Sequence, residues 1–277
     1  PFSEWERQRI NGDNPRYAVL EERYEVLARQ QIICGCHVHL GLGDREAEIP
    51  VLNHIRPWLP VLLALSANSP FWEGTDTGYA SYRTEMWTRW PTAGMPPDLR
   101  DRAHYETLVA ELVSAGAIPD ATQLYWFARP SARFPTLEIR ICDVCLCVDD
   151  AVAVAGLVRG LAWACADANQ CGSLMPAMTP PVLDAAVWRA ARFGLGGELI
   201  HPESGRPEPA ALVVEALLEL ARPGLEAHGD VEEITELVAR LLTDGTGADR
   251  QRAAFRAGGP ARVVQQAAEC MSPASGR

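Results

Sequence analysis

Two short segments combine side chains that could bind a divalent metal and a phosphate group. One segment, GCHVH, contributes His37 and His39, and a second, TLEIR, contributes Glu138 and Arg140. Side chains two positions apart on a strand point to the same face of a sheet. If both segments are extended, each presents a polar pair on one surface. Such a combination is suited to phosphoryl chemistry.

Each pair also has a purely structural explanation. Two histidines on one strand face are often a hydrogen-bonded polar edge, and a glutamate and an arginine on one face can form a cross-strand salt network. The two pairs together are more informative, because four polar residues on otherwise apolar strands are costly to bury without a ligand or partners. They favour a ligand site and do not identify a reaction.

A loop-rich segment over 71–97 contributes Arg83 as a further candidate site residue. Two more candidates, Asn68 and Ser69, precede this segment. The segment is rich in glycine, proline, threonine and aromatic residues without a sustained period, and a short helix is expected at 81–87. Arg83 could clamp a carboxylate in bidentate fashion. Asn68 and Ser69 directly precede a proline, so helix termination is their plain explanation.

The composition excludes several mechanisms. The sequence contains no lysine, so all 25 residues counted as lysine or arginine are arginines. P-loop and Schiff-base enzymes need a lysine and are excluded. The net charge of −11 argues against a general nucleic-acid or anionic-membrane surface and favours small-molecule partners. The motifs of the serine hydrolase elbow, the Rossmann fold and the zincins are absent from the sequence.

Eight cysteines in 277 residues do not resemble a small disulfide scaffold, and no secretory signal or long apolar membrane span is recognised. A reducing cytoplasm is therefore the expected location. Cys142, Cys145 and Cys147 begin with a C-x-x-C spacing that could suggest zinc. On a strand, Cys142 and Cys145 face opposite sides, so buried structural thiols are the favoured interpretation.

The first half of the chain alternates helical and extended patterns. Apolar spacing predicts a helix over 15–29 and a strand over 32–42. A helix over 47–67 follows, which Pro57 and Pro60 should bend or split. A further helix is expected over 98–115. A hairpin follows, with strands over 123–128 and 136–144 and a turn at 129–131.

From about residue 149 the pattern is helical almost to the end. Apolar stripes predict helices over 151–168, 181–193, 208–221, 231–242 and 248–257. Early strands and late helices favour an α+β fold over a βαβ repeat. A chain of 277 residues can form one large or two modest domains.

Five motifs occur in order along the chain. They are CGCHVH from Cys34, RPWLP from Arg56, LSANSPF from Leu65, GYASYRT from Gly78 and TLEIRICD from Thr136. This set resembles the carboxylate-amine ligase family, also called type 2 glutamate–cysteine ligase, over most of the chain to about Gly259. The resemblance implies a fold similar to that of glutamine synthetase, a curved antiparallel sheet that forms a funnel and is packed with helices.

The same resemblance implies roles for the polar residues. His37 and Glu138 would ligate a catalytic Mg²⁺. Arg140 would neutralise the transferred phosphoryl group, and Arg83 would face the substrate or the phosphate. The residues that would meet ATP, a co-substrate, are His39, Asn68 and Ser69.

The implied activity has two steps. A carboxylate attacks the γ-phosphate of ATP to give an acyl phosphate, and an amine then displaces phosphate to form an amide. The expected acid is glutamate, and the expected acceptor is cysteine or another amine. The alternative, from a different class, is a non-catalytic subunit of the same fold that binds a nucleotide or an amino acid. A metal-dependent hydrolase on the same face is a third and poorer hypothesis.

One feature of the family is missing. Family members begin with a strand bearing Gly-x-Glu-x-Glu, whose glutamates resemble additional metal ligands, and no such strand precedes Pro1 in this sequence. Either the chain is part of a longer protein, another chain supplies the strand, or catalysis has been lost. The first explanation is favoured because the remaining site residues are present. The resemblance also implies that residues 1–277 form a single catalytic domain that lacks its N-terminal strands, and it suggests a homodimer.

Overall fold

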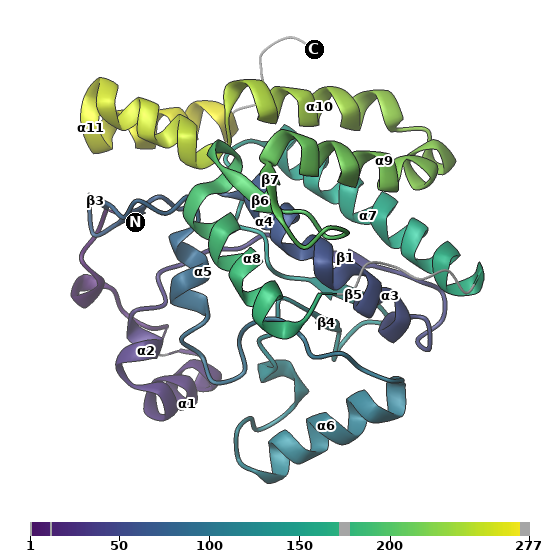
Figure 1. Cartoon of the computed structure of the whole chain (residues 1–277). Helices are drawn as coiled ribbons and strands as arrows, with labels where there is room; N and C mark the ends of the chain where they lie inside the picture. The colour runs from purple at the N-terminus through teal and green to yellow at the C-terminus, as the bar shows by residue number, and fades with distance from the viewer. Residues whose placement is uncertain (1, 12, 172–177, 272–277) are drawn as a thin grey trace.

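Helices dominate the structure, a computed structural model that describes residues 2–11, 13–171 and 178–271. In Figure 1, the helices α7 (Val148–Cys171), α9 (Ala210–His228) and α10 (Val231–Asp244) gather on one side of the central strands. The helix α6 (Arg102–Ser114) lies at the opposite side. The predicted α+β fold is confirmed, with most of the helical residues in the later half.

A three-stranded antiparallel sheet occupies the centre of the molecule. Its order is β1 (Val38–Leu40), β5 (Leu137–Ile139) and β4 (Ala128–Pro130). The β4–β5 pair is the predicted hairpin, with shorter strands than expected, and all the residues of both strands are buried. Among the described residues the sheet does not close into a barrel. Two small ribbons complete the strands, formed by β2 (Phe71–Trp72) with β3 (Thr75–Asp76) and by β6 (Glu198–Ile200) with β7 (Pro207–Pro209).

The first strand is shorter than the predicted strand over 32–42. An isolated bridge pairs Gly35 with Asp143, whereas the regular ladder pairs Val38 with Ile139. Between these two pairs, the later segment has one residue more than the earlier one, which is the arrangement of a β-bulge. The guanidinium of Arg83 donates to two backbone carbonyls of the bulged segment. The inserted side chain therefore ends the regular pairing.

The proline-containing helix is split as predicted. It consists of α3 (Glu48–Ile55), the 3₁₀ helix η2 (Arg56–Trp58) and α4 (Leu59–Ser66). Pro57 lies in η2, and Pro60 lies in the first turn of α4, where a missing N–H costs no hydrogen bond. Every residue of α4 is buried, so this helix forms the centre of the core.

Several boundaries differ from the predicted ones. The helix expected over 15–29 is divided into α1 (Pro15–Tyr24) and α2 (Val26–Arg29) by Glu25, whose φ is 49°. The last helix, α11 (Gly247–Met271), is longer than expected but contains a break at Gly258 and Gly259. The short helix predicted near residue 84 is present. It is α5 (Tyr82–Trp87). The remaining elements are α8 (Pro180–Phe193) and the 3₁₀ helices η1 (Trp5–Arg7), η3 (Ala121–Gln123) and η4 (Gly194–Gly196).

The helix α7 is long and apolar enough to cross a bilayer, judged by length and composition. It is the one such helix among the residues that the structure describes, and a single helix of this kind is weak evidence for a membrane span. Moreover, 56% of its most apolar window is buried inside the protein. It packs against α3, α9 and α10, which is the pattern of a core helix in a globular protein.

Glycines allow α7 and α9 to approach closely. A Cβ added at Gly160 would lie 2.7 Å from the carbonyl oxygen of Ala221. Gly160→Ala is expected to lower the free energy of unfolding by about 1–3 kcal/mol, because overpacking outweighs the better helix propensity of alanine. Gly41→Ala is the control, since no atom would lie within 4 Å of its added Cβ. Urea unfolding measures both, and equal midpoints would contradict the close packing.

Candidate functional site

The central sheet aligns three charged or ionisable side chains in a row across its strands. His39 of β1 and Arg129 of β4 are both paired in register with Glu138 of β5. His37 and Arg140 lie two residues along their segments from this row. The structure therefore brings together the four residues of the two predicted polar pairs and adds Arg129.

Glu138 is the centre of this cluster. Its Oε1 lies 3.2 Å from His37 Nδ1 and 3.7 Å from His39 Nε2. Arg129 Nε donates to Oε2 at 3.1 Å, and Arg140 Nη1 donates to Oε1. Glu138 is only 4% exposed, whereas about a third of each imidazole side chain is exposed. The cluster is thus buried at its carboxylate and open at its histidines.

The surroundings of Glu138 keep it ionised at neutral pH. Burial by itself raises the pKa of Glu138, but the hydrogen bond with His37 and the charges of Arg140 and Arg129 outweigh this and lower the pKa to about 2. The pKa of Arg140 falls to about 10, because of its burial and the neighbouring charge of Arg129, and Glu138 offsets part of that fall. Two guanidinium groups then face one carboxylate, so the cluster can stabilise an additional anion.

Arg129 was not predicted, because the sequence places it in the turn of the hairpin. Its Nη1 donates to the carbonyl oxygens of Ala121, Thr122 and Leu124 at 2.8, 3.1 and 2.6 Å. The same guanidinium therefore holds the chain around η3 and the carboxylate of Glu138. Only the register of the two strands, which the sequence does not specify, could have indicated this position.

Arg129→Met is expected to lower the free energy of unfolding by about 3–5 kcal/mol, because it removes a partner of a buried carboxylate and leaves three carbonyls without their donor. Arg133→Met is the matched control, since Arg133 is exposed beyond the end of the same strand. Its effect should be within about 0.5 kcal/mol. Urea denaturation followed by circular dichroism measures both changes, and similar losses in the two variants would contradict this role of Arg129.

Three other predicted residues meet at Asp143 rather than at Glu138. The backbone N–H of Asn68 and the hydroxyl of Ser69 donate to Asp143 Oδ2 at 2.9 and 2.7 Å. Ser81 donates to Oδ1 at 2.8 Å, and Arg83 Nη1 lies 3.8 Å from the same oxygen. Burial raises the pKa of Asp143, and Arg83 and these hydrogen bonds oppose the rise. Asp143 thus ties the loop after α4 to the segment after β5.

The guanidinium of Arg83 is directed at protein acceptors. It donates to the carbonyl oxygens of Ile141 and Arg140 at 3.0 and 3.1 Å, and the residue is 3% exposed. Together with Asn68 and Ser69 it lines a cavity of about 190 Å³. Contact of Arg83 with a substrate, and of Asn68 and Ser69 with a nucleotide, stay predictions.

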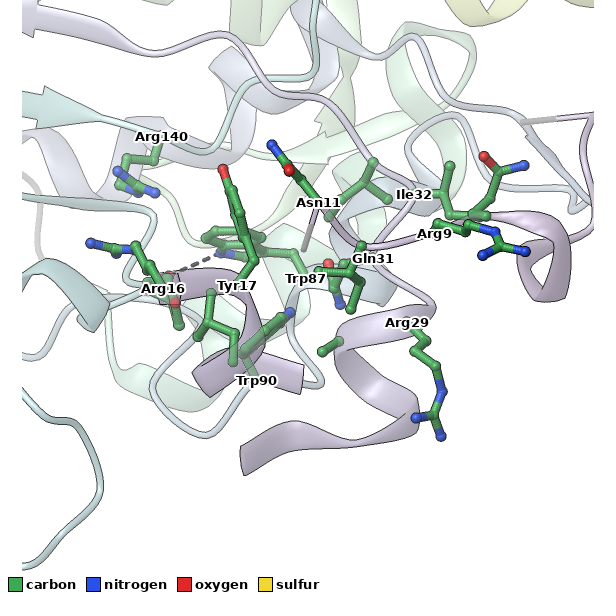
Figure 2. A pocket seen from close by; sticks show the side chains of 16 residues that line it. Arg9, Asn11, Arg16, Tyr17, Arg29, Gln31, Ile32, Trp87, Trp90 and Arg140 are labelled. Atoms are coloured by element: carbon green, nitrogen blue, oxygen red, sulfur yellow. Dashed lines mark hydrogen bonds between the residues drawn. The ribbon is translucent and has the colours of Figure 1, made fainter. Parts of the chain in front are cut away.

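Two larger cavities adjoin the Glu138 cluster. The first, of about 460 Å³, is lined by Glu138, His39 and Arg129 among others. The second, of about 730 Å³, is lined mainly by aromatic, apolar and arginine side chains and is drawn in Figure 2. Four residues line both cavities, and they are Arg16, Tyr17, Tyr125 and Arg140. The two spaces therefore meet at Arg140.

The described residues do not by themselves make a complete metal site. None of their histidine, cysteine, aspartate and glutamate side chains form a group of three or more that could hold a metal ion. Both oxygens of Glu138 already have partners, and Mg²⁺ prefers oxygen ligands. His37 and Glu138 could therefore contribute to a metal only together with ligands from elsewhere, such as phosphate oxygens.

The cysteine cluster also shows no metal site among the described residues. Cys142, Cys145 and Cys147 are free thiols, and Cys142 is fully buried. Burial raises the pKa of the Cys142 thiol to about 12. Cys142 is thus buried as expected, whereas the other two are partly exposed.

Comparisons with known proteins identify the family of this chain. Residues 1–267 match the family model described as Glutamate-cysteine ligase family 2 (GCS2). The chain is 47% identical over 248 residues to "Putative glutamate--cysteine ligase 2" of Salinispora arenicola, an alignment that covers 89% of this chain and 65% of the relative. It is 45% identical over 241 residues to "Putative glutamate--cysteine ligase 2-2" of Frankia alni, covering 87% and 63%. The chain thus spans just under two thirds of the length of these relatives. It belongs to the glutamate–cysteine ligase family 2.

Proposed function

We propose that this protein forms an amide from a carboxylic acid and an amine at the expense of ATP, through an acyl phosphate. Membership of the ligase family supports the reaction class. The observation that carries the proposal is the buried Glu138 carboxylate between Arg129 and Arg140, where two cavities meet. A reaction between a phosphorylated acid and an amine needs an anion-stabilising centre that both substrates can reach.

The cavity of about 460 Å³ is the proposed site of the ATP phosphates. Arg129 and Arg140 supply positive charge that is already oriented by Glu138, so little reorganisation is needed when charge develops on phosphoryl oxygens. His39 also lines this cavity. Its Nδ1 lies 2.9 Å from the hydroxyl of Thr136, which orients the ring for contact with a phosphate.

Mg²⁺ is proposed as the ion that accompanies ATP and neutralises phosphate charge. His37 and Glu138 are the residues of this chain that would approach it, and the remaining ligands would come from elsewhere. The arginines of this chain bind the phosphoryl group. Arg140 holds a phosphoryl oxygen, and Glu138 fixes the orientation of the Arg140 guanidinium. The free thiols are consistent with the proposed cytoplasmic location.

Glutamate is the proposed acid, with cysteine or another amine as acceptor, because the relatives carry names of that activity. A homodimer stays a prediction. A second candidate, a non-catalytic subunit that binds a nucleotide or an amino acid, is favoured by one observation: both oxygens of Glu138 are already engaged by side chains of this chain.

Nucleotide products distinguish these candidates. Purified protein would be incubated with Mg²⁺, ATP, glutamate and a panel of amines, and ADP would be resolved from AMP. ADP and phosphate that appear only with both acid and amine would support the ligase, whereas AMP would contradict an acyl phosphate. If turnover is absent even after a Glu-x-Glu strand is supplied upstream, the binding subunit becomes the better account.

A further inference from the structure

The Arg140 guanidinium has one hydrogen bond with the part of the chain that the structure describes. Its Nη1 donates to Glu138 Oε1. Its Nε is buried without a hydrogen-bond partner there, and the whole residue is 8% exposed. A single hydrogen bond lets a planar guanidinium pivot about the bonded nitrogen, whereas a bidentate pair fixes its plane. A second contact must therefore set the orientation of Arg140.

The indole ring of Trp87 provides this second contact. The Cζ of Arg140 lies over the ring, 5.6 Å from its centroid, which is within the range of a cation–π interaction. Tryptophan gives the strongest interaction of this kind, and burial strengthens it because water does not compete for the cation. The ring face therefore restrains the plane of the guanidinium, while Glu138 fixes one of its nitrogens.

Trp87 is in turn held by two contacts with Tyr125. Its Nε1 donates to the carbonyl oxygen of Tyr125 at 2.9 Å, the bond drawn as a dashed line in Figure 2. The two rings meet edge to face, with centroids 5.2 Å apart. An indole that is held through both its N–H group and its ring has little freedom to rotate. Trp87 is therefore a rigid support for Arg140.

Arg83 places Trp87 beside Arg140. It lies four residues before Trp87 on α5, on the same face of the helix, and its Cζ is 5.5 Å from the centroid of the same ring. The guanidinium of Arg83 donates to the carbonyl oxygens of Arg140 and Ile141 at 3.1 and 3.0 Å. The helix α5 thus contacts the backbone of Arg140 through Arg83 and its side chain through Trp87.

The remaining nitrogen of Arg140 is available to a ligand. Nη2 forms no hydrogen bond with the described residues and, unlike Nε, retains accessible surface. Arg140 lines both the proposed phosphate cavity of about 460 Å³ and the adjoining cavity of about 730 Å³. Nη2 is therefore the donor that an anion at the junction of these cavities can reach.

We propose that Trp87 is a positioning residue for Arg140, whose ring holds the guanidinium in the plane in which Nη2 donates to the transferred phosphoryl group. This role rests on the proposed function, because the ligase reaction places a phosphoryl group beside Arg140. Trp87 does not touch the reacting atoms. It orients Arg140 before the phosphoryl group arrives, so less orientational freedom is lost on binding and in the transition state.

Titration calorimetry with inorganic tripolyphosphate, without nucleotide, acid or amine, measures this orientation separately from turnover. Trp87→Leu should weaken tripolyphosphate binding about 10-fold, because leucine has no aromatic face for the guanidinium. Trp87→Phe keeps a ring and should weaken binding only about 3-fold. Trp90→Leu is the matched control and should keep the affinity of the unchanged protein. The Trp90 ring packs against the same Tyr125 ring at 5.1 Å, but it has no cation–π contact among the described residues.

An Arg140→Gln background shows whether Trp87 acts through Arg140. Once Arg140→Gln is present, Trp87→Leu should lower the tripolyphosphate affinity no further, because the group that Trp87 orients is gone. A loss caused by general damage to the fold would recur in both backgrounds. Urea unfolding of each variant identifies any that has lost its structure.

The outcomes separate this role from the proposed reaction. Unchanged tripolyphosphate affinity in Trp87→Leu, or an equal loss with and without Arg140→Gln, would overturn the role of Trp87 even if the protein releases ADP. Failure of the unchanged protein to bind tripolyphosphate would overturn it as well. Coupling between Trp87 and Arg140 without ADP formation from any acid and amine, with the upstream strand supplied, would overturn the ligase and the transferred phosphoryl group. Coupling together with an about 10-fold lower kcat for ADP formation in Trp87→Leu is the expected result.

Discussion

Glu138→Gln is expected to lower the rate of ADP formation by about 10²–10³-fold, because it removes the charge that orients Arg140 and Arg129 toward a phosphoryl group. Glutamine keeps the shape of the side chain. The loss of charge leaves two buried guanidinium groups without their carboxylate, so the free energy of unfolding should fall by about 3 kcal/mol. A typical domain remains folded after such a loss.

The control for this variant is Glu219→Gln, which changes an exposed carboxylate paired with Arg222 and should leave ADP formation unchanged. Acid unfolding gives a second measurement. Folding lowers the pKa of Glu138 from 4.5 to about 2, so its stabilisation is present above pH 4.5 and is lost as the pH falls toward 2. Glu138→Gln should remove this part of the pH dependence. Unchanged ADP formation in Glu138→Gln would contradict a catalytic role for the cluster.

Asp143→Asn is expected to lower the free energy of unfolding by about 3–5 kcal/mol, as much as Arg129→Met. Asp143 is 1% exposed, and its substitution leaves the buried Arg83 without a counter-charge. Asparagine also presents one amide group toward the donors Ser69 and Ser81, which cannot both be satisfied as before. Urea unfolding measures the change.

The matched control for Asp143→Asn is Asp149→Asn. Asp149 pairs with Arg240 at 2.8 Å, and about half of its side chain is exposed, so its removal should cost at most about 1 kcal/mol. If the two variants unfold at the same urea concentration, the cluster around Asp143 does not hold these segments together.

Local sequence signals were sufficient where the determinant is local. Pro57 and Pro60 divided the apolar helix as predicted, because proline removes a donor wherever it lies in a helix. The boundaries of β1 could not be predicted in this way. They depend on the side chain of Arg83, which comes from a distant helix and takes the carbonyls that a longer ladder would use.

The site was predictable only in part for the same reason. The two-residue spacing of His37 with His39 and of Glu138 with Arg140 is local, and the structure brings these side chains together. Arg129 joins them through strand register, and the aromatic cavity joins segments that lie far apart in the sequence. The spacing of residues along one segment does not predict contacts between segments that lie far apart in the sequence.

Transfer of labelled oxygen tests the central claim most directly. Glutamate carrying oxygen-18 in its carboxylates would be supplied with ATP, Mg²⁺ and an accepted amine, and the released inorganic phosphate would be analysed by mass spectrometry. An acyl phosphate requires that one carboxylate oxygen leaves with phosphate, so the account predicts one labelled oxygen for each phosphate formed with the amide. Amide formation with unlabelled phosphate would contradict it.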